Sequence, residues 1–204
     1  MEISNKNSRK EYKFLFSKKE IYKLKKFYGE KLENLYPNRT IKSLYLDTKD
    51  LDLYKLSKQS DVNKYKVRFR TYPKKDTGIY REIKSNKETG KEKSTELTEY
   101  RSLQEIKFDI YKNYILSPCL IIKYDREYFK LDSVARLTID TNLQFKLPKN
   151  ISLLDKYVGE NFYIVELKLL NNKTTDLTEY FINSPVAFSK YEYGVEKLYN
   201  SSFI

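Results

Sequence analysis

The chain has 204 residues, of which 40% are apolar and 15% aromatic, enough to bury the core of one domain. It contains no histidine and a single cysteine, Cys119, which excludes histidine-dependent nucleophilic catalysis, an internal disulfide and a multi-cysteine zinc site. Lysine and arginine number 40 against 28 acidic residues, so the formal net charge is +12, and any chemistry must use carboxylates, cationic side chains, tyrosines or a metal ion held by oxygen.

The first third of the chain predicts a strand and a helix, followed by a second strand and a second, shorter helix. Charged and aromatic residues alternate over 9–14, which is the period of a strand. Ser17 and Glu20 have the spacing of a capping box, in which each side chain accepts from the other's backbone N–H. A helix follows whose apolar face extends to Leu35 and which is expected to end before Pro37. The second strand is expected over 41–46 and the short helix over 50–56.

The remainder of the chain is dominated by alternating or continuously apolar runs that predict strands. These strands are expected over 64–72, 78–84, 91–97, 120–130, 134–140 and 162–170. Helices are expected over about 98–116, after Thr175, and over 188–200. Roughly eight strands with few helices indicate an α+β fold built on an antiparallel sheet or barrel.

Residues 64–70 carry the most informative alternation. Every even position is cationic, whereas Tyr65, Val67 and Phe69 are apolar, and a strand places these two sets on opposite faces. Cations two residues apart on one face lie ~7 Å from each other, within the Debye length of ~8 Å, so their repulsion is not fully screened. In an open sheet whose charged face lies in water, that face normally carries both acidic and basic side chains. The alternative that we favour is a closed barrel with a cationic interior that encloses an extended anionic ligand.

Nine short motifs follow one another in a recognisable order along about 180 residues. They lie at 9–14, 43–48, 66–72, 82–84, 91–93, 124–128, 136–140, 165–168 and 189–191. In this order they resemble the VTC domain of the triphosphate tunnel metalloenzyme (CYTH-like) superfamily, to which a polyphosphate polymerase belongs. The resemblance implies one domain over 1–204, folded as an antiparallel eight-stranded β-barrel with flanking helices and a basic interior that holds a triphosphate or polyphosphate.

The resemblance also implies roles for individual residues. It implies catalytic cations at Arg68, Arg70, Lys84, Arg126, Arg136 and Lys190. It implies further phosphate-binding cations at Arg9, Lys13, Lys66, Lys91 and Lys93. Glu166 matches the family's metal-binding glutamate, which would hold Mn²⁺ or Mg²⁺. Glu82 and Glu11 are further candidates for metal ligands, although pairing with neighbouring lysines is the interpretation that we favour for both.

The implied activity is metal-dependent phosphoryl transfer, with ATP-driven polyphosphate synthesis as the first hypothesis. The alternatives are a tripolyphosphatase or nucleoside triphosphatase that uses water as the acceptor, and a module that binds polyphosphate without turnover. Residues 9–13 read RKEYK where related cyclases and thiamine triphosphatases have Glu-x-Glu-x-Lys, so a cation replaces the first carboxylate. Nucleic acid is not an expected partner, because the chain has no helix-turn-helix or glycine-rich RNA-binding motif.

The sequence gives no sign of a membrane-spanning or secreted protein. No apolar run approaches the ~20 residues that a spanning helix needs. No hydrophobic stretch of the kind found in signal peptides follows Met1. We therefore expect a cytoplasmic protein without the SPX-type and membrane regions that accompany the eukaryotic polymerase, and the sequence identifies no membrane partner.

Overall fold

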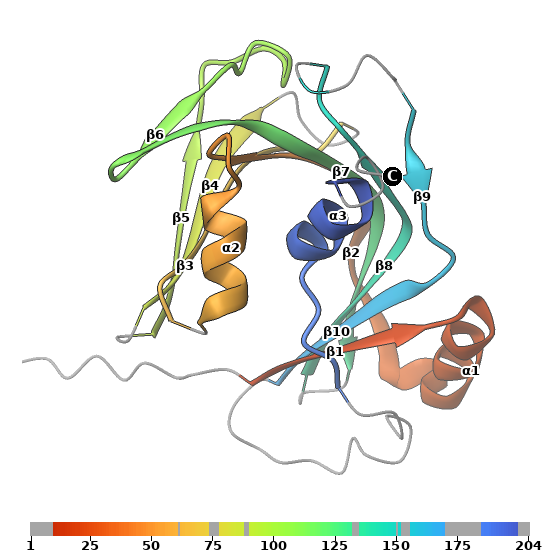
Figure 1. The fold of residues 1–204 in the computed structure, drawn as a ribbon. Coiled ribbons are helices and arrows are strands. Elements are labelled where there is room, and N and C mark those ends of the chain that lie inside the picture. Colours follow the sequence, from red (N-terminus) through yellow and green to blue (C-terminus); the bar gives the residue numbers. More distant parts are fainter. Residues whose placement is uncertain are drawn as a thin grey trace, which may run out of the picture. The chain divides into compact units, whose positions relative to one another are not determined.

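The computed structural model describes residues 10–60, 62–73, 78–87, 90–131, 135–149, 151, 156–169 and 185–199. Its helices and strands are, in chain order, β1 (Glu11–Phe16), α1 (Lys18–Tyr28), the 3₁₀ helix η1 (Gly29–Lys31), β2 (Leu32–Asp47), α2 (Asp52–Gln59), β3 (Lys64–Thr71), β4 (Ile79–Lys87), β5 (Gly90–Leu97), β6 (Asp109–Tyr111), β7 (Tyr114–Leu131), β8 (Ala135–Lys146), β9 (Val158–Gly159), β10 (Tyr163–Leu169) and α3 (Lys190–Tyr199) (Figure 1).

The chain divides into two compact units. The first unit comprises Met1–Asn38, Asp125–Leu143 and Glu160–Phe188, and the second comprises Arg39–Tyr124, Gln144–Gly159 and Ser189–Ile204. The strands β2, β7 and β8 therefore contribute residues to both units. One domain over 1–204 stays a prediction.

In the first unit, β10 pairs antiparallel with β1 on one side and with β8 on the other. Alternate residues of these strands, among them Phe14, Val165 and Leu137, form one buried cluster. The helix α1 begins with the capping box that the sequence predicts, because both reciprocal hydrogen bonds between Ser17 and Glu20 are present. Ile21 and Leu24 on its apolar face join the same cluster. The expected continuation of this helix to Pro37 is wrong, because α1 ends at Tyr28 and Leu35 lies in β2.

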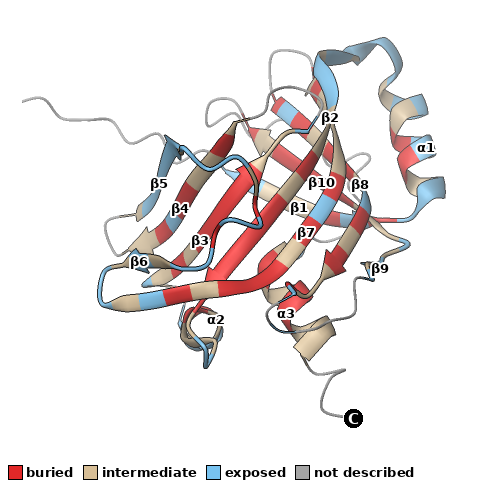
Figure 2. Ribbon diagram, turned by 90° about the horizontal axis from the view of Figure 1, so that it is seen from above, coloured by how far each residue is buried: buried red, intermediate tan, exposed pale blue. Residues whose placement is uncertain are grey.

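In the second unit, β3 pairs with β2 and β4, and β4 pairs with β5, all antiparallel. Val67 and Phe69 of β3 pack with Leu44 of β2 and Leu53 of α2 in a second core cluster, and α2 lies beside β3 (Figure 1). Most of β3 is buried, whereas β5 is exposed over nearly its whole length (Figure 2). The side chains of β3 are therefore covered on both faces of the sheet.

The expectation of a closed eight-stranded barrel is wrong. The described residues form ten strands in the order β1-β10-β8-β7-β2-β3-β4-β5, with β6 and β9 beside this path, and its two end strands do not pair. Residues 91–97 of the end strand β5 are all exposed and include two lysines and two glutamates. Charged side chains of this kind protect a sheet edge from further pairing. The two additional strands, β6 and β9, are only three and two residues long and leave no clear pattern in the sequence.

The expected helix over about 98–116 is also wrong. Leu103 and Ile106 have helical spacing and are buried, but they lie in turns and irregular backbone. The segment continues as the hairpin of β6 and β7, which is joined by a two-residue turn at Lys112, whose φ is 51°. Branched and aromatic residues flank this turn on both sides and favour strands over a helix.

The C-terminal helix expected over 188–200 is confirmed as α3. The helix expected after Thr175 lies outside the described residues. Among the helices that the structure describes, none is long and apolar enough to cross a membrane.

Candidate functional site

In the second unit, one face of β3, β4 and β5 is strongly cationic. The strand register places Arg68 opposite Glu82, and Lys84 opposite both Lys66 and Lys93. Because residues two apart on a strand share a face, this cationic face carries Lys64, Lys66, Arg68, Arg70, Lys84, Lys91 and Lys93. Within the described parts of these three strands, Glu82 is the one acidic residue on the same face. Such an excess of positive charge suits a polyanionic ligand.

Arg68 and Arg70 are the buried centre of the cationic face, with 9% and 7% of their surface exposed. Arg68 donates from Nε and Nη2 to Oε2 of Glu82, at 2.8 and 2.5 Å, and Arg70 Nη1 lies 3.5 Å from the same oxygen. Lys93 Nζ donates to Oε1 of Glu82 at 2.9 Å. One buried carboxylate is therefore shared by three cations.

The groups around Glu82 keep its carboxyl ionised. Burial alone would raise the pKa of this carboxyl, but the charges of Arg68 and Arg70, together with hydrogen bonds from Lys93 and Arg68, outweigh it and lower the pKa to about 2. Glu82 is therefore ionised at neutral pH and offsets part of the repulsion between the two guanidinium groups.

The depressed pKa of Glu82 predicts a loss of stability in acid. The stabilisation is fully present above the unfolded-state pKa of 4.5 and is lost as the pH falls from there towards about 2, on the order of 3 kcal/mol of unfolding free energy. Urea denaturation at about pH 6 and about pH 3 would measure this loss in the wild type and in Glu82→Gln. At about pH 6, Glu82→Gln should have a lower unfolding free energy than the wild type. Its unfolding free energy should also fall less than that of the wild type between about pH 6 and about pH 3. An equal fall in both proteins would contradict this role.

Neutral oxygens complete the hydrogen bonding of the two arginines. Arg68 Nη1 donates to the phenolic oxygen of Tyr45 at 2.7 Å, and Arg70 Nε donates to Oγ of Ser43 at 3.2 Å. Arg70 Nη2 also lies 3.4 Å from the phenolic oxygen of Tyr124. Tyr45, Tyr124 and Ser43 were not among the predicted site residues. The signal that would have found Tyr45 and Ser43 is the register of β2 and β3, which pairs them with Arg68 and Arg70.

The start of α3 also reaches the cationic face. Lys66 Nζ donates to Oγ of Ser189 at 2.8 Å and lies 2.9 Å from a carboxylate oxygen of Glu192. Lys190 Nζ lies 4.8 Å from the centre of the Tyr124 ring, a cation–π distance. The Tyr191 ring stacks on Tyr45, with 5.1 Å between centroids and 16° between planes. The 189–191 motif therefore contributes side chains to the same cluster as Arg68.

The position of α3 is fixed by a buried carboxylate. Asp47, which is fully buried, accepts hydrogen bonds from the backbone N–H groups of Leu53 and Tyr54 in α2 and from the hydroxyl of Tyr191. Burial is the main cause of the raised pKa of Asp47, and these hydrogen bonds act against it. Asp47 thus ties α2 and α3 to the end of β2.

The first unit has a polar face of its own on β1, β10 and β8. The register brings Lys13, Glu166 and Thr138 into one row, and Glu11, Lys168 and Arg136 into the next. Lys168 Nζ lies 2.8 Å from Glu166 and 3.5 Å from Glu11. Burial lowers the pKa of Lys168, but the neighbouring charges of Glu166 and Glu11 outweigh it, so the pKa is raised.

Two further cations of the first unit have fixed partners. Arg126 donates through Nε and Nη2 to the two carboxylate oxygens of fully buried Asp140, at 2.5 and 2.7 Å. Lys13 Nζ donates to the backbone carbonyl of Phe188 at 2.9 Å. Arg126 is thus clamped in a bidentate pair that fixes the direction of its guanidinium group.

Glu166 and Thr138 offer two oxygen donors of the kind that a divalent metal ion prefers. Glu166 is buried, and the hydroxyl oxygen of Thr138, opposite it in the register, is buried without a hydrogen-bond partner in the described part of the chain. Mg²⁺ and Mn²⁺ prefer oxygen ligands, and Mg²⁺ is usually held by one or two carboxylates plus water and phosphate oxygens. The described residues contain no group of three or more acidic or cysteine side chains placed to hold a metal ion by themselves.

The structure thus distributes the predicted site residues over both units. In the second unit they are Lys66, Arg68, Arg70, Glu82, Lys84, Lys91, Lys93 and Lys190. In the first unit they are Glu11, Lys13, Arg126, Arg136 and Glu166. Lys84, Lys91, Lys93, Arg136 and Glu11 are exposed, and Arg9 lies outside the described residues. Their functional roles stay predictions.

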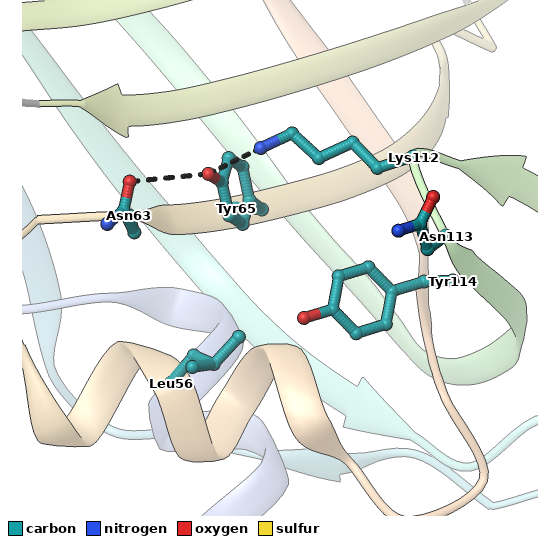
Figure 3. Close-up of a pocket in the computed structure, with 6 residues that line it drawn as sticks. All are labelled: Leu56, Asn63, Tyr65, Lys112, Asn113 and Tyr114. Carbon is teal, nitrogen blue, oxygen red and sulfur yellow. Dashed lines mark hydrogen bonds between the residues drawn. The ribbon is translucent and has the colours of Figure 1, made fainter.

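A cavity of about 310 Å³ in the second unit is separate from the cationic face. It is lined by Leu56, Asn63, Tyr65, Lys112, Asn113 and Tyr114 (Figure 3). Lys112 lies over the Tyr65 ring and donates to its hydroxyl at 2.5 Å. Tyr65 belongs to the apolar side of β3, so the strand itself separates this cavity from Arg68.

Comparison with protein families identifies the family of the chain. The family model for the VTC domain matches residues 8–108 and 91–199. The chain belongs to the VTC domain family. The resemblance to the VTC domain that the nine motifs indicate is therefore confirmed. No curated protein sequence matches the chain.

This VTC domain is similar to several solved structures at low sequence identity. The PH1819 protein from Pyrococcus horikoshii OT3 is 12% identical, with a TM-score of 0.57 over 96% of this chain and 99% of that one. The putative adenylyl cyclase HpAC1 from Hippeastrum, which has a dominant triphosphatase activity, is 13% identical, with a TM-score of 0.49 over 95% and 96%. A putative adenylate cyclase from Vibrio parahaemolyticus is 14% identical, with a TM-score of 0.46 over 84% and 81%. The similarity to PH1819 shows a common fold and carries no information about activity.

Proposed function

We propose that this VTC domain binds the phosphate chain of a nucleoside triphosphate or polyphosphate and catalyses metal-dependent phosphoryl transfer, with polyphosphate synthesis from ATP as the first candidate reaction. Membership in the VTC family supports an activity on triphosphates. The observation that carries the proposal is the pair of buried arginines, Arg68 and Arg70, on a face with seven cations and one carboxylate. A buried excess of cations is costly unless an anion compensates it.

The residues of the cationic face can supply most of what phosphoryl transfer requires. The reaction needs positioning of the phosphate chain and positive charge around the oxygens of the transferred group. Arginine donates to phosphate through a planar fork, while lysine offers a compact charge. The guanidinium groups of Arg68 and Arg70 are already oriented by Glu82, Tyr45 and Ser43, so little reorganisation is needed when phosphate binds. A terminal phosphate acceptor is anionic and requires no general base.

We propose Glu166 as the carboxylate that holds a Mn²⁺ or Mg²⁺ ion, with Thr138 beside it. When bound, this ion would neutralise charge on phosphate oxygens as a Lewis acid. Glu82 does not share this proposed role, because its two oxygens are occupied by Arg68, Arg70 and Lys93. Its proposed role is that of a resident counter-ion for the two arginines.

A phosphate chain should bind much more tightly than a single phosphate. Several cations of the cationic face are separated along the strands, so a longer anion contacts more of them, and we expect tripolyphosphate to exceed orthophosphate in affinity on the order of a hundredfold. The exposed lysines Lys84, Lys91 and Lys93 contribute screened interactions, so affinity should fall as salt rises. Isothermal titration calorimetry at two salt concentrations measures both effects. Equal affinities for the two anions would contradict a polyphosphate site.

One assay distinguishes the candidate reactions. Purified protein is incubated with ATP and Mn²⁺, and phosphorus NMR follows the products. Signals of chain-internal phosphate would support the polymerase, and orthophosphate released without chain growth would replace it by a triphosphatase. Tight binding without any product would reduce the protein to a polyphosphate-binding module. Arg68→Ala in the same assay serves as the control for contaminating activity.

A further inference from the structure

Tyr45 occupies an unusual position for a tyrosine in a core. Its side chain is 5% exposed and lies between Arg68, which is opposite it in the register, and the stacked ring of Tyr191. The phenolic oxygen accepts the hydrogen bond from Arg68 Nη1 at 2.7 Å. Because a phenol has one hydrogen to donate and arginine accepts none, the hydroxyl hydrogen of Tyr45 is not used by this bond. Among the described residues, the hydrogen bond from Arg68 is the one that the structure shows at this oxygen.

The surroundings of Tyr45 favour an anion at this point. The titratable and charged groups around it are Asp47 on its own strand, Lys66, Arg68 and Arg70 on β3, Glu82 on β4, Cys119 and Tyr124 on β7, and Tyr191 on α3. Burial would raise the pKa of the Tyr45 phenol, but the charges of Arg68, Arg70 and Lys66, with the hydrogen bond from Arg68, outweigh it and lower the pKa to about 8. Tyr45 therefore ionises within reach of ordinary assay conditions.

We propose that Tyr45 is a phosphate-binding residue that donates its hydroxyl hydrogen to a phosphate oxygen held by Arg68, and that binding at this site is consequently coupled to a proton. This inference rests on the proposed function of the cationic face. When the phenol loses its proton, the donor disappears and a negative charge faces the incoming anion. Bound phosphate in turn disfavours the negative charge of the Tyr45 phenolate. Binding of phosphate therefore causes the phenolate to take up a proton.

The direction of the pH dependence follows from this linkage. Below about pH 8 the Tyr45 phenol is neutral, so its ionisation does not change the affinity for tripolyphosphate. Above it, each pH unit should weaken binding by up to about tenfold until the phenol of the complex also ionises. Ionisation of the ligand itself is the same for every variant and cancels when variants are compared.

Calorimetry with tripolyphosphate, between about pH 7 and about pH 9 in buffers of different ionisation enthalpy, tests the proposal on wild type and Tyr45→Phe. The phenyl ring keeps the stack on Tyr191, so the variant should fold. We expect proton uptake and the steep fall of affinity in the wild type, and a loss of both in Tyr45→Phe, with about tenfold weaker binding at the lower pH. Tyr65→Phe, a tyrosine on the opposite face of β3, is the matched control and should behave as the wild type.

The outcomes separate this inference from the proposed function. Tripolyphosphate binding whose pH dependence and proton uptake persist in Tyr45→Phe would overturn the role of Tyr45 and leave the phosphate site intact. A wild-type protein that binds tripolyphosphate at no pH would overturn both. Ultraviolet difference absorbance of wild type against Tyr45→Phe gives an independent check, because it should show a tyrosinate with a midpoint near pH 8 in the free protein. A midpoint well above this would contradict the proposal.

Discussion

Arg68→Ala should weaken tripolyphosphate binding on the order of a hundredfold, because it removes the buried guanidinium that we propose as a phosphate ligand, and alanine forms no charge-assisted hydrogen bonds in its place. Turnover of ATP below saturation should fall by at least the same factor. The fold should survive, since Glu82 keeps Arg70 and Lys93 as partners and is not left as an unpaired buried charge. Calorimetry with tripolyphosphate measures the affinity, and urea denaturation measures the unfolding free energy, which we expect to fall on the order of 2 kcal/mol.

Arg81→Ala is the matched control for this experiment. Arg81 lies on the neighbouring strand β4, pairs with Asp109 at 2.7 Å and faces the apolar side of the sheet with Phe69. The variant changes the net charge by the same amount as Arg68→Ala, so a general electrostatic effect would weaken binding equally in both. We expect tripolyphosphate affinity to change little in Arg81→Ala. Arg68→Lys, which keeps the charge and loses the fork, should lie between the wild type and Arg68→Ala.

Local patterns predicted the start of α1 and the two faces of β3, but they did not predict where α1 ends and β2 begins. The capping box at Ser17 marks the start of α1, and the alternation over 64–70 places Arg68 and Arg70 together on one face, where both are buried. These features depend on residues two to four apart, which the sequence displays directly. Closure of the sheet depends instead on pairing between strands at the two ends of the path, and no local alternation reports it.

The parts of the site that the sequence did not reveal depend on register and on long-range contacts. Tyr45 becomes a partner of Arg68 only because β2 and β3 pair at that position. Thr138 becomes a candidate oxygen donor for a metal ion only because it lies opposite Glu166 and its buried hydroxyl lacks a hydrogen-bond partner among the described residues. Glu192 reaches Lys66 from a helix more than a hundred residues further along the chain. None of these relations can be derived from composition or spacing.

Glu166→Gln should separate phosphate binding from turnover. The glutamine keeps the size of the side chain and removes its charge, so an anionic chain should bind without metal as well as before or more tightly. Metal-dependent turnover of ATP should fall on the order of a thousandfold, because a bound divalent ion stabilises developing charge by several kcal/mol. Calorimetry without metal and phosphorus NMR with Mn²⁺ measure the two properties. Thermal denaturation checks that Lys168, which loses its partner at 2.8 Å, leaves the fold intact.

Glu127→Gln provides the matched control for the metal experiment. Glu127 is a half-buried carboxylate of the first unit, and it pairs with Lys25 at 2.5 Å. Glu127→Gln removes a similar charge and a similar ion pair. Among the described residues the buried hydroxyl without a hydrogen-bond partner belongs to Thr138, opposite Glu166, so turnover with Mn²⁺ should stay near the wild-type rate in Glu127→Gln. If Glu166→Gln retained full Mn²⁺-dependent activity while Arg68→Ala lost binding, Glu166 would be only the ionic partner of Lys168. The metal-binding carboxylate would then have to be sought at Glu11 or Glu82, and the resident counter-ion role of Glu82 would need to be reconsidered.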